Sequence, residues 1–241
     1  MAEEKVALVT GGSRGLGLEL SRFLAGQGYN LVIDGRDRAV LDSAATEIAN
    51  RGATVTVIAG DVSEAAHREA LAKAAADLGG LDLLVNNASH LGPSPMPELV
   101  QYQPQDLARV FEVNVMAPIA LIQRCLALLE VRRGLVVNIS SDAAIGGYEG
   151  WGGYGASKAA LDLASLTLAN ELRESGISVV SVDPGDMRTQ MHQDAFPGED
   201  ITDRPLPEVT LPFWAWLLNQ DPKSVSGQRF QAQAERWAVA A

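Results

Sequence analysis

The chain has 241 residues, of which 47% are apolar and 20% charged, and 30 acidic against 19 basic side chains give a formal net charge of −11. This length and composition predict one large globular domain and exclude disordered and fibrous classes. The negative charge argues against nucleic acid as a partner, because it repels phosphate backbones.

The targeting and metal signals are weak. No apolar run approaches about 18 residues and the start lacks the pattern of a secretory signal, so we expect a cytoplasmic protein with no membrane span. The single cysteine, Cys125, excludes an internal disulfide and is expected to pack in an apolar helix. Scattered histidines give no metal-ligand spacing, so no metal is expected, and His67 and His192 are predicted to be surface residues.

Short, continuous apolar runs rich in β-branched residues alternate with helix-like stretches along the chain. Such runs are typical of parallel strands that are buried on both faces, and parallel pairing requires crossover helices. The predicted fold is therefore a doubly wound α/β sheet with helices on both faces, in a single domain over residues 1–241. The predicted strands are 5–10, 30–34, 54–60, 81–85, 134–140 and 177–182, followed by a helix at 211–218 and a last strand at 227–231.

Two helical stretches, 105–130 and 154–174, carry more apolar residues than one sheet-facing side needs. Their second face is either covered by loops of the same chain or used for self-association as a homodimer or homotetramer. Between them and the last strand, residues 190–212 contain four prolines and resist assignment to a regular element. A loop of this length is usually functional, so we interpret it as a substrate lid.

A glycine-rich turn follows the first predicted strand, with Gly11, Gly15 and Gly17 before an amphipathic helix. Glycines let the backbone turn sharply and approach a ligand, and the start of the helix offers free N–H groups to a pyrophosphate. A tight turn without a ligand is the alternative, but three glycines at this spacing exceed what turning alone requires. The first strand-to-helix junction of a doubly wound sheet is also where such folds bind nucleotides.

Tyr154 and Lys158 are four residues apart, so on a helix they share one face. A nearby ammonium stabilises a phenolate and lowers its pKa from about 10 towards the range useful for proton exchange. An ordinary exposed pair is the alternative reading. Ser141 favours a catalytic pair over an exposed one, because it ends a predicted parallel strand, where active-site groups collect. Its neighbour Ser140 should face the opposite side of the strand.

Together, the Gly-x-x-x-Gly-x-Gly turn, Asn86-Asn87-Ala88, Ser141 and Tyr154-Gly-Ala-Ser-Lys158 resemble the short-chain dehydrogenase/reductase family, from residue 5 to about 227. The resemblance implies a Rossmann-type fold and hydride transfer between a nicotinamide cofactor and a carbonyl or secondary alcohol. In these roles Tyr154 is the general acid/base, Ser141 polarises the carbonyl, and Lys158 grips the ribose and tunes Tyr154. Asn114 would hold a water that links Lys158 to solvent, or else it is a helix-kinking core amide.

The resemblance also implies the cofactor contacts. Asp61 would face the adenine amine, although a cap near Ser63 is an equal alternative, and Ser89 stands where the family has glycine. The Thr189 hydroxyl would hold the carboxamide or a phosphate oxygen. The full set of expected contacts is Gly11, Ser13, Arg14, Gly15, Leu16, Gly17, Arg36, Asp61, Val62, Asn87, Ala88, Tyr154, Lys158, Pro184, Gly185 and Thr189.

The end of the second strand bears on cofactor choice. Members that prefer NAD place an acid there, and Gly35 occupies that position here. Arg36 and Arg14 could bind a 2′-phosphate, which favours NADP(H), unless both are ordinary solvated arginines. If the strand ends one residue earlier, Asp34 becomes the ribose acceptor and NAD is favoured.

The sequence predicts an NADP(H)-dependent carbonyl reductase or alcohol dehydrogenase that acts on a small molecule. His90, Trp151 and segment 190–212 are expected substrate contacts, unless they merely fill space. The alternative is a regulatory or scaffolding protein that binds the cofactor without turnover. The sequence does not choose among ketone, sugar, steroid or acyl-thioester substrates.

Overall fold

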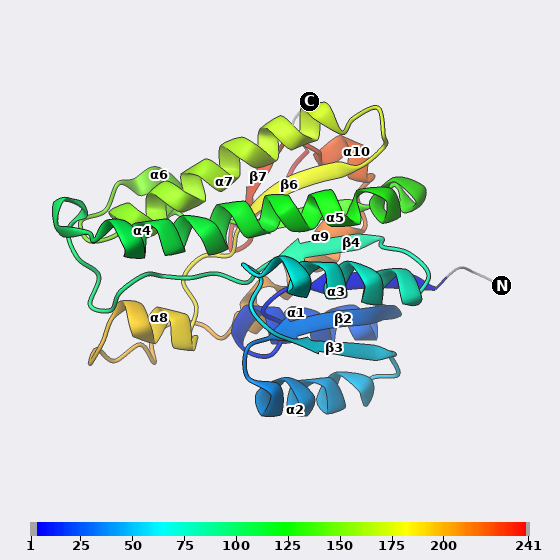
Figure 1. Cartoon of the computed structure of the whole chain (residues 1–241), viewed down its shortest axis with the longest axis horizontal. Helices are drawn as coiled ribbons and strands as arrows, with labels where there is room; N and C mark the ends of the chain where they lie inside the picture. Colours follow the sequence, from blue (N-terminus) through cyan, green and yellow to red (C-terminus); the bar gives the residue numbers. More distant parts are fainter. Residues whose placement is uncertain (1–3, 240–241) are drawn as a thin grey trace.

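The computed structural model describes residues 4–239 and has one parallel sheet at its centre (Figure 1). The strands lie in the order β3-β2-β1-β4-β5-β6-β7, and every neighbouring pair is parallel. This confirms the predicted doubly wound sheet. The strands are β1 (Lys5–Val9), β2 (Tyr29–Gly35), β3 (Val55–Ala59), β4 (Leu83–Asn86), β5 (Leu135–Ile139), β6 (Ser178–Asp183) and β7 (Arg229–Gln231).

The order of the sheet reverses at β1, which pairs with β2 on one side and β4 on the other. In doubly wound sheets this switch point leaves a crevice beyond the carboxyl ends of the strands, where nucleotides bind. The segments that follow β1, β2, β4, β5 and β6 all leave the sheet at that edge. They contain the residues that the sequence analysis singled out.

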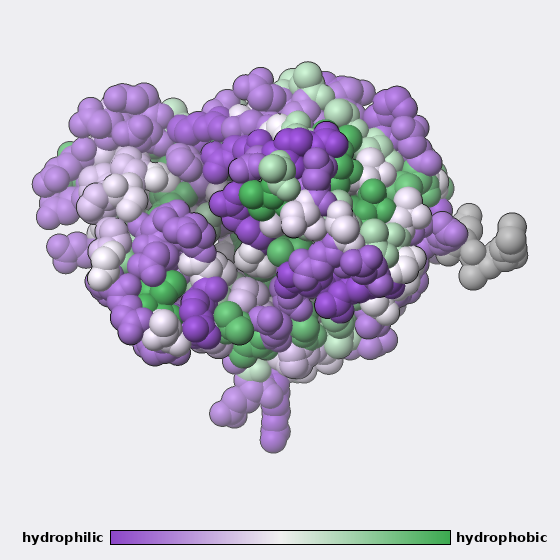
Figure 2. Space-filling model, turned by 90° about the horizontal axis from the view of Figure 1, so that it is seen from below, coloured by the Kyte–Doolittle hydropathy of each residue, from purple (hydrophilic) through white to green (hydrophobic). Residues whose placement is uncertain are grey.

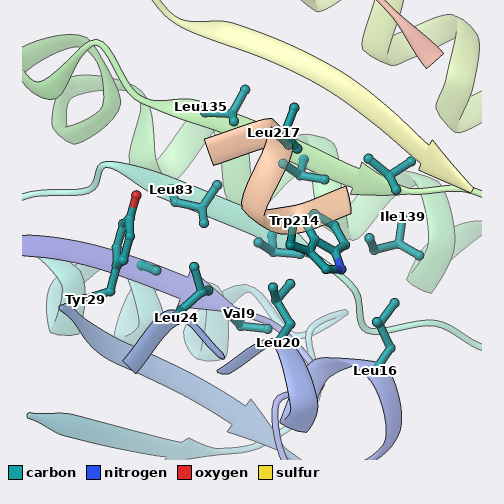
Figure 3. Close-up of a cluster of buried hydrophobic side chains, with 14 of the residues drawn as sticks. Val9, Leu16, Leu20, Leu24, Tyr29, Leu83, Leu135, Ile139, Trp214 and Leu217 are labelled. Carbon is teal, nitrogen blue, oxygen red and sulfur yellow. The ribbon is translucent and has the colours of Figure 1, made fainter. Parts of the chain in front are cut away.

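Helices cover both faces, and each face has its own buried core. On one face α1 (Gly15–Gly26), α2 (Arg38–Ala49) and α9 (Leu211–Leu218) pack on the sheet; Figure 3 shows Leu20, Trp214 and Leu217 meeting the strand residues Val9 and Leu83. On the other face lie α3 (Ala65–Asp77), α5 (Ala117–Arg132) and α7 (Gly152–Glu171). Burying each large apolar side chain contributes about 1.5–3 kcal/mol, so these two cores hold the sheet rigidly.

The stretch from Pro104 to Arg132 is one nearly continuous helical rod. It comprises α4 (Pro104–Phe111), a π-helical turn (Glu112–Met116) and α5. By length and composition alone this rod could cross a membrane. Its apolar side instead packs into the second core through residues such as Leu121 and the predicted packing residue Cys125, as a core helix does.

The prediction that residues 190–212 lack regular structure is wrong at both ends of the segment, whereas residues 196–206 form neither helix nor strand. Thr189 accepts a hydrogen bond from the His192 N–H and caps α8 (Gln190–Ala195). A 3-10 turn (Pro207–Thr210) follows, and its first-turn proline, like Pro212 in α9, needs no N–H partner there. Ser94 Oγ ties the segment to the loop after β4 by donating to the Asp194 carbonyl at 2.6 Å. The remaining elements are a 3-10 turn (Leu99–Gln101), α6 (Ala143–Gly146) and α10 (Pro222–Val225).

The surface seen from below is mostly hydrophilic, with small, separate hydrophobic patches (Figure 2). The apolar side chains that α5 and α7 expose include Leu126, Leu163 and Leu166. The second faces of the two long helices are therefore only partly covered by the chain itself.

Candidate active site

The glycine-rich loop after β1 is shaped to accept a dinucleotide. Gly11 and Gly15 have φ of +66° and +55°, which disfavour side chains, and a Cβ on Gly17 would lie 2.3 Å from the Gly11 carbonyl oxygen. Helix α1 starts without a side-chain cap and without an acid in its first turn. Its N–H groups are therefore available to a pyrophosphate. Arg14 is exposed beside this end, whereas the Leu16 side chain is buried in the core.

A buried Asp–His pair lies beneath this loop. The Asp34 side chain is almost fully buried; its Oδ1 accepts a hydrogen bond from the Gly11 N–H at 2.6 Å, and its Oδ2 lies 2.8 Å from His67 Nε2. The prediction of His67 as a surface residue is thus wrong, because α3 turns it inward to meet Asp34. Both Asp34 oxygens therefore already have hydrogen-bond partners within the protein.

The end of β2 carries no acid. The strand runs to Gly35, and a Cβ there would lie 2.7 Å from Ser13 Oγ, so a larger residue would need the loop to move. Arg36, the next residue, is exposed. Arg36 and Arg14 are thus exposed cations at the carboxyl edge of the sheet, whereas the Asp34 carboxylate between β2 and the loop is buried and already bonded to Gly11 and His67.

After β3, Asp61 is held by its own chain. Its Oδ1 accepts from the Ser63 N–H at 2.9 Å and from Ser63 Oγ at 2.8 Å, as the capping alternative expected, and its Oδ2 pairs with Arg109 of α4. Burial alone would raise the pKa of Asp61, but the hydrogen bonds from Ser63 and the charge of Arg109 lower it below its usual value. Val62 is buried. No motif pointed to Arg109, which joins the turn after β3 to α4.

The loop after β4 is fixed by hydrogen bonds to β1. Thr10 Oγ1 accepts from the N–H groups of Asn87 and Ala88, both at 3.0 Å, and Asn87 Nδ2 donates to the Thr10 carbonyl at 2.8 Å. Ser89 has a negative φ, so the serine in place of the family glycine strains nothing. Its hydroxyl donates to Asn114 Oδ1 at 3.1 Å.

Asn114 lies in the π-helical turn and is fully buried. Its Oδ1 also accepts from the His90 N–H (2.7 Å), and its Nδ2 donates to the His90 carbonyl and to Ser157 Oγ, both at 2.9 Å. The amide thereby clamps the loop after β4 onto α7. Because all of its hydrogen-bonding positions have partners, a water held by Asn114 would have to bind its main chain.

Tyr154 and Lys158 lie on the same face of α7, with Lys158 Nζ 5.5 Å from the centre of the Tyr154 ring. Burial raises the pKa of Tyr154 to about 12, while a hydrogen bond with Ser89 lowers it. In the protein alone the Tyr154 pKa therefore moves opposite to the lowering expected from Lys158, because burial disfavours the phenolate. Burial also lowers the pKa of Lys158 to about 8, and its Nζ donates to the Ile139 carbonyl at 2.7 Å.

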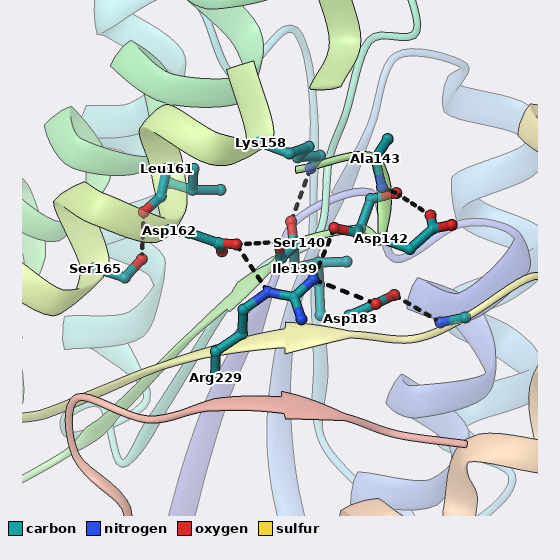
Figure 4. Close-up of polar contacts among 12 residues, drawn as sticks. Ile139, Ser140, Asp142, Ala143, Lys158, Leu161, Asp162, Ser165, Asp183 and Arg229 are labelled. Carbon is teal, nitrogen blue, oxygen red and sulfur yellow. Dashed lines mark hydrogen bonds and ion pairs between the residues drawn. The ribbon is translucent and has the colours of Figure 1, made fainter. Parts of the chain in front are cut away.

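Ser141 follows the end of β5 and is half-buried. Its hydroxyl donates to Asp142 Oδ1 at 3.0 Å and accepts from the Ala143 N–H at 3.2 Å. Ser140 points the other way and donates to Asp162 Oδ2 at 2.8 Å (Figure 4). The hydroxyls of Ser140 and Ser141 thus point in different directions, as expected for neighbouring residues along a strand.

The loop after β6 is held from the C-terminal segment. Gly185 has φ of +74° and donates its N–H to Asp183 Oδ1 at 3.0 Å. Gln233 Nε2 donates to the carbonyls of Pro184 (3.0 Å) and Asp186 (2.9 Å), a clamp that no motif indicated. Further along the same segment, the Thr189 methyl lies near Gly15 of the glycine-rich loop, so the two loops meet across the crevice.

Apolar side chains surround Tyr154 on the lid side. Trp151 meets the Tyr154 ring edge-on with centres 5.9 Å apart, and Phe196 lies 5.9 Å from Trp151. The cluster is completed by Leu91, Met96, Ala143 and Ala195. His192 packs on Phe196 with ring centres 4.9 Å apart, so its predicted surface position is wrong. Its side chain is only 9% exposed, because α8 turns it against Phe196.

His90 lies between the two ends of the site. It is half-buried, and its pKa is lowered by burial and then by the charges of Arg109 and Arg36. Among residues 4–239 there is no group of three or more His, Cys, Asp or Glu side chains that could hold a metal ion.

Comparison with known proteins gives a consistent picture. The family model described as short chain dehydrogenase matches residues 5–200. An L-xylulose reductase of Caenorhabditis elegans is 37% identical over 199 residues, covering 82% of this chain and 77% of the relative. A short-chain dehydrogenase structure from Shigella flexneri in complex with NADP is 30% identical with a TM-score of 0.88, covering 96% of this chain and 98% of that one. An NAD⁺-bound xylitol dehydrogenase shares the fold at 23% identity, with a TM-score of 0.82 and coverage of 95% and 97%.

Proposed function

Because the chain belongs to the short-chain dehydrogenase family, we propose that it is an NADP(H)-dependent oxidoreductase that interconverts a carbonyl group and a secondary alcohol. The observation that carries the proposal is the placement of Tyr154 and Lys158 on one face of α7. They stand at the sheet edge where Ser141 and the glycine-rich loop also lie. A protein that only bound a cofactor would have no need of this group, which argues against the regulatory or scaffolding alternative.

The bound cofactor would supply or accept the hydride, and the protein must move the proton. Tyr154, protonated at neutral pH because its burial raises its pKa to about 12, is suited to donate that proton to a carbonyl oxygen. The Ser141 hydroxyl would turn from Asp142 to polarise the same oxygen. Lys158, whose ammonium now donates to the Ile139 carbonyl, would hold the nicotinamide ribose.

The preference for NADP(H) rests on the adenosine end. Asp34 is engaged by Gly11 and His67, Gly35 offers no carboxylate, and Arg36 is exposed and free to form a fork with a 2′-phosphate. The likeness to a protein complexed with NADP supports the same choice. The pyrophosphate would lie at the start of α1.

The apolar cluster suggests the substrate class. Trp151, Phe196, Leu91 and Met96 place rings and aliphatic side chains next to the Tyr154 phenol. A carbonyl compound with a flat, apolar substituent would bury that surface there, whereas the hydroxyl groups of a sugar would lose their hydrogen bonds to water. We therefore expect aryl and alkyl ketones to be better substrates than sugars. The exposed apolar faces of α5 and α7 favour a homodimer or homotetramer.

The test is the oxidation of NADPH, followed by its absorbance, with a panel of matched carbonyls: an aryl ketone, an aliphatic diketone and a ketose. We expect turnover of the first two and little of the third, and slower rates with NADH. Tight NADPH binding without turnover of any carbonyl, or of any alcohol with NADP⁺, would favour the non-enzymatic alternative. Turnover of the ketose alone would contradict the substrate class and leave the enzyme assignment intact.

A further inference from the structure

The side chain of Arg229 connects three segments at the carboxyl edge of the sheet (Figure 4). Arg229 begins β7, the edge strand. Its Nε donates to Asp162 Oδ2 at 2.9 Å, and its Nη2 donates to the Ser141 carbonyl at 2.8 Å and to Asp183 Oδ2 at 3.3 Å. These acceptors belong to α7, to the turn after β5 and to the end of β6. One guanidinium thus fixes three elements of the candidate active site relative to one another.

Through its contact with Asp162, Arg229 acts on the surroundings of Lys158. Asp162 lies one turn after Lys158 on α7, so the two share a face. Burial lowers the pKa of Lys158, and the charge of Asp162 opposes that lowering. Arg229 and Ser140 Oγ both donate to the same oxygen of Asp162 and so hold the carboxylate in place. Asp162 Oδ1 is buried and has no hydrogen-bond partner among the described residues.

The contact with Asp183 leads to the loop after β6. Asp183 Oδ1 accepts from the Gly185 N–H at 3.0 Å, while Oδ2 faces Arg229. Burial raises the Asp183 pKa, and the Gly185 hydrogen bond and the charge of Arg229 lower it. The guanidinium therefore also stabilises the ionised form of the carboxylate that fixes the start of this loop.

These contacts differ from those of an ordinary surface ion pair, which contributes little. Only 24% of the Arg229 side chain is exposed, against 16% for Asp162 and 4% for Asp183. Because these partners are only slightly exposed, water competes less for their hydrogen bonds than at the surface, and their geometry is better fixed. The bond to the Ser141 carbonyl is the link to chemistry, since it holds the main chain of a residue that must reach the substrate oxygen.

We propose that Arg229 is a positioning residue for the reaction: it holds the main chain of Ser141 and, through Asp162, the negative charge beside Lys158. This inference rests on the proposed function and adds two residues that lie outside every motif of the sequence. The charged or titratable groups involved are Tyr154, Lys158 and Asp162 on α7, Arg229 on β7, Asp183 at the end of β6 and Asp142 after β5.

Three variants of the full-length protein test the proposal. Arg229→Met removes the positive charge and the N–H donors of the guanidinium, whereas Arg229→Lys keeps the charge. Asp162→Asn removes the carboxylate charge with little change in shape. Arg124→Met is the matched control, because Arg124 forms an exposed pair with Glu69 at 3.3 Å away from the site. The measurements are kcat and KM against pH with the best carbonyl of the panel, NADPH affinity by fluorescence, and the pH dependence of unfolding without cofactor.

We expect Arg229→Met to lower kcat by about 10- to 100-fold while NADPH affinity changes little, because the hydroxyl of Ser141 is misplaced. Arg229→Lys should recover part of that loss. In Asp162→Asn, the loss of activity at alkaline pH should begin at lower pH, and the pH dependence of unfolding should shift the same way, because Lys158 loses the charge that favours its ammonium form. The control should match the wild type.

An unchanged kcat in a folded Arg229→Met variant would overturn the proposal, as would an Asp162→Asn variant with unshifted pH profiles. If Arg229→Met does not fold, the Arg229→Lys and Asp162→Asn profiles decide the outcome. A wild-type protein without any turnover would instead refute the proposed function, and the unfolding profiles would still test the link between Asp162 and Lys158.

Discussion

The main-chain N–H of Gly11 donates a 2.6 Å hydrogen bond to the carboxylate of Asp34, which is 99% buried beneath the glycine-rich loop. The other oxygen of the carboxylate lies against His67. The glycine-rich turn is therefore anchored from below by a buried side chain of β2.

Replacing Asp34 should weaken both the fold and cofactor binding. Asp34→Ala leaves the Gly11 N–H and His67 without their acceptor, which should cost about 1–3 kcal/mol in the free energy of unfolding. The loosened loop should also raise the NADPH dissociation constant. Urea denaturation and fluorescence titration measure the two effects. Asp77→Ala is the control, because its pair with Lys73 is exposed and should contribute almost nothing.

Arg36 should control the choice between the two cofactors. Hydrogen bonds to a charged group contribute about 1.5–3 kcal/mol, so Arg36→Ala should raise the KM for NADPH by about 10- to 100-fold and leave that for NADH nearly unchanged. Arg51→Ala, at an exposed position beyond α2, should change neither. Equal effects on both cofactors would show that Arg36 does not meet the 2′-phosphate.

Removing the phenolic hydroxyl of Tyr154 should abolish turnover without loss of NADPH binding, because Tyr154→Phe keeps the ring against Trp151 and deletes only the proton donor. Single-turnover absorbance and NADPH fluorescence measure the two properties. Tyr29→Phe is the matched control, since Tyr29 begins β2 at the opposite edge of the sheet. Retained turnover in Tyr154→Phe would rule out this residue as the acid.

The lowered pKa of Lys158 predicts a pH dependence of stability with a definite sign. Lys158 titrates at about 8 in the folded protein and at 10.5 when unperturbed, so between these values the unfolded state binds more protons. Stability from this group should therefore rise with pH across that window and be lost as pH falls through 8. Tyr154, raised from 10.0 to about 12, acts in the opposite direction only above pH 10.

Comparison of the wild type with Lys158→Met isolates this effect. At pH 7 the variant lacks the buried ammonium of Lys158, so its free energy of unfolding should be higher than that of the wild type. That gain should shrink by about 1.4 kcal/mol for each pH unit between 8 and 10. Urea denaturation at pH 7, 8, 9 and 10 measures it. A difference that does not vary with pH would mean that Lys158 keeps its proton throughout.

The sequence was informative where structure is local. Continuous β-branched runs predicted the first six strands because burial on both faces needs an apolar residue at every position; the short last strand at 227–231 was expected without such a run. Helical spacing placed Tyr154 and Lys158 on one face because residues four apart lie one turn from each other. The roles of His67, Arg109 and Arg229 could not be predicted, since each depends on a partner far along the chain that only tertiary folding brings near.

The segment 190–212 shows the limit of composition as a guide. Its prolines indicated an irregular loop, and Pro205 does lie in one, but Pro197 stands just after α8, and Pro207 and Pro212 stand in the first turns of the elements that follow. What decided the structure of α8 was the Thr189 cap and the packing of Ala195 and Phe196 beside Tyr154, neither of which a count of helix breakers can reveal.

The clamp formed by Gln233 has a practical consequence for handling the protein. This single amide, close to the last described residues, spans the carbonyls of Pro184 and Asp186. A chain shortened ahead of Gln233 would leave both carbonyls without this donor, whereas the segment ahead of β1 lies at the opposite edge of the parallel sheet. Changes to the chain ends for kinetic work are therefore safer at the amino end.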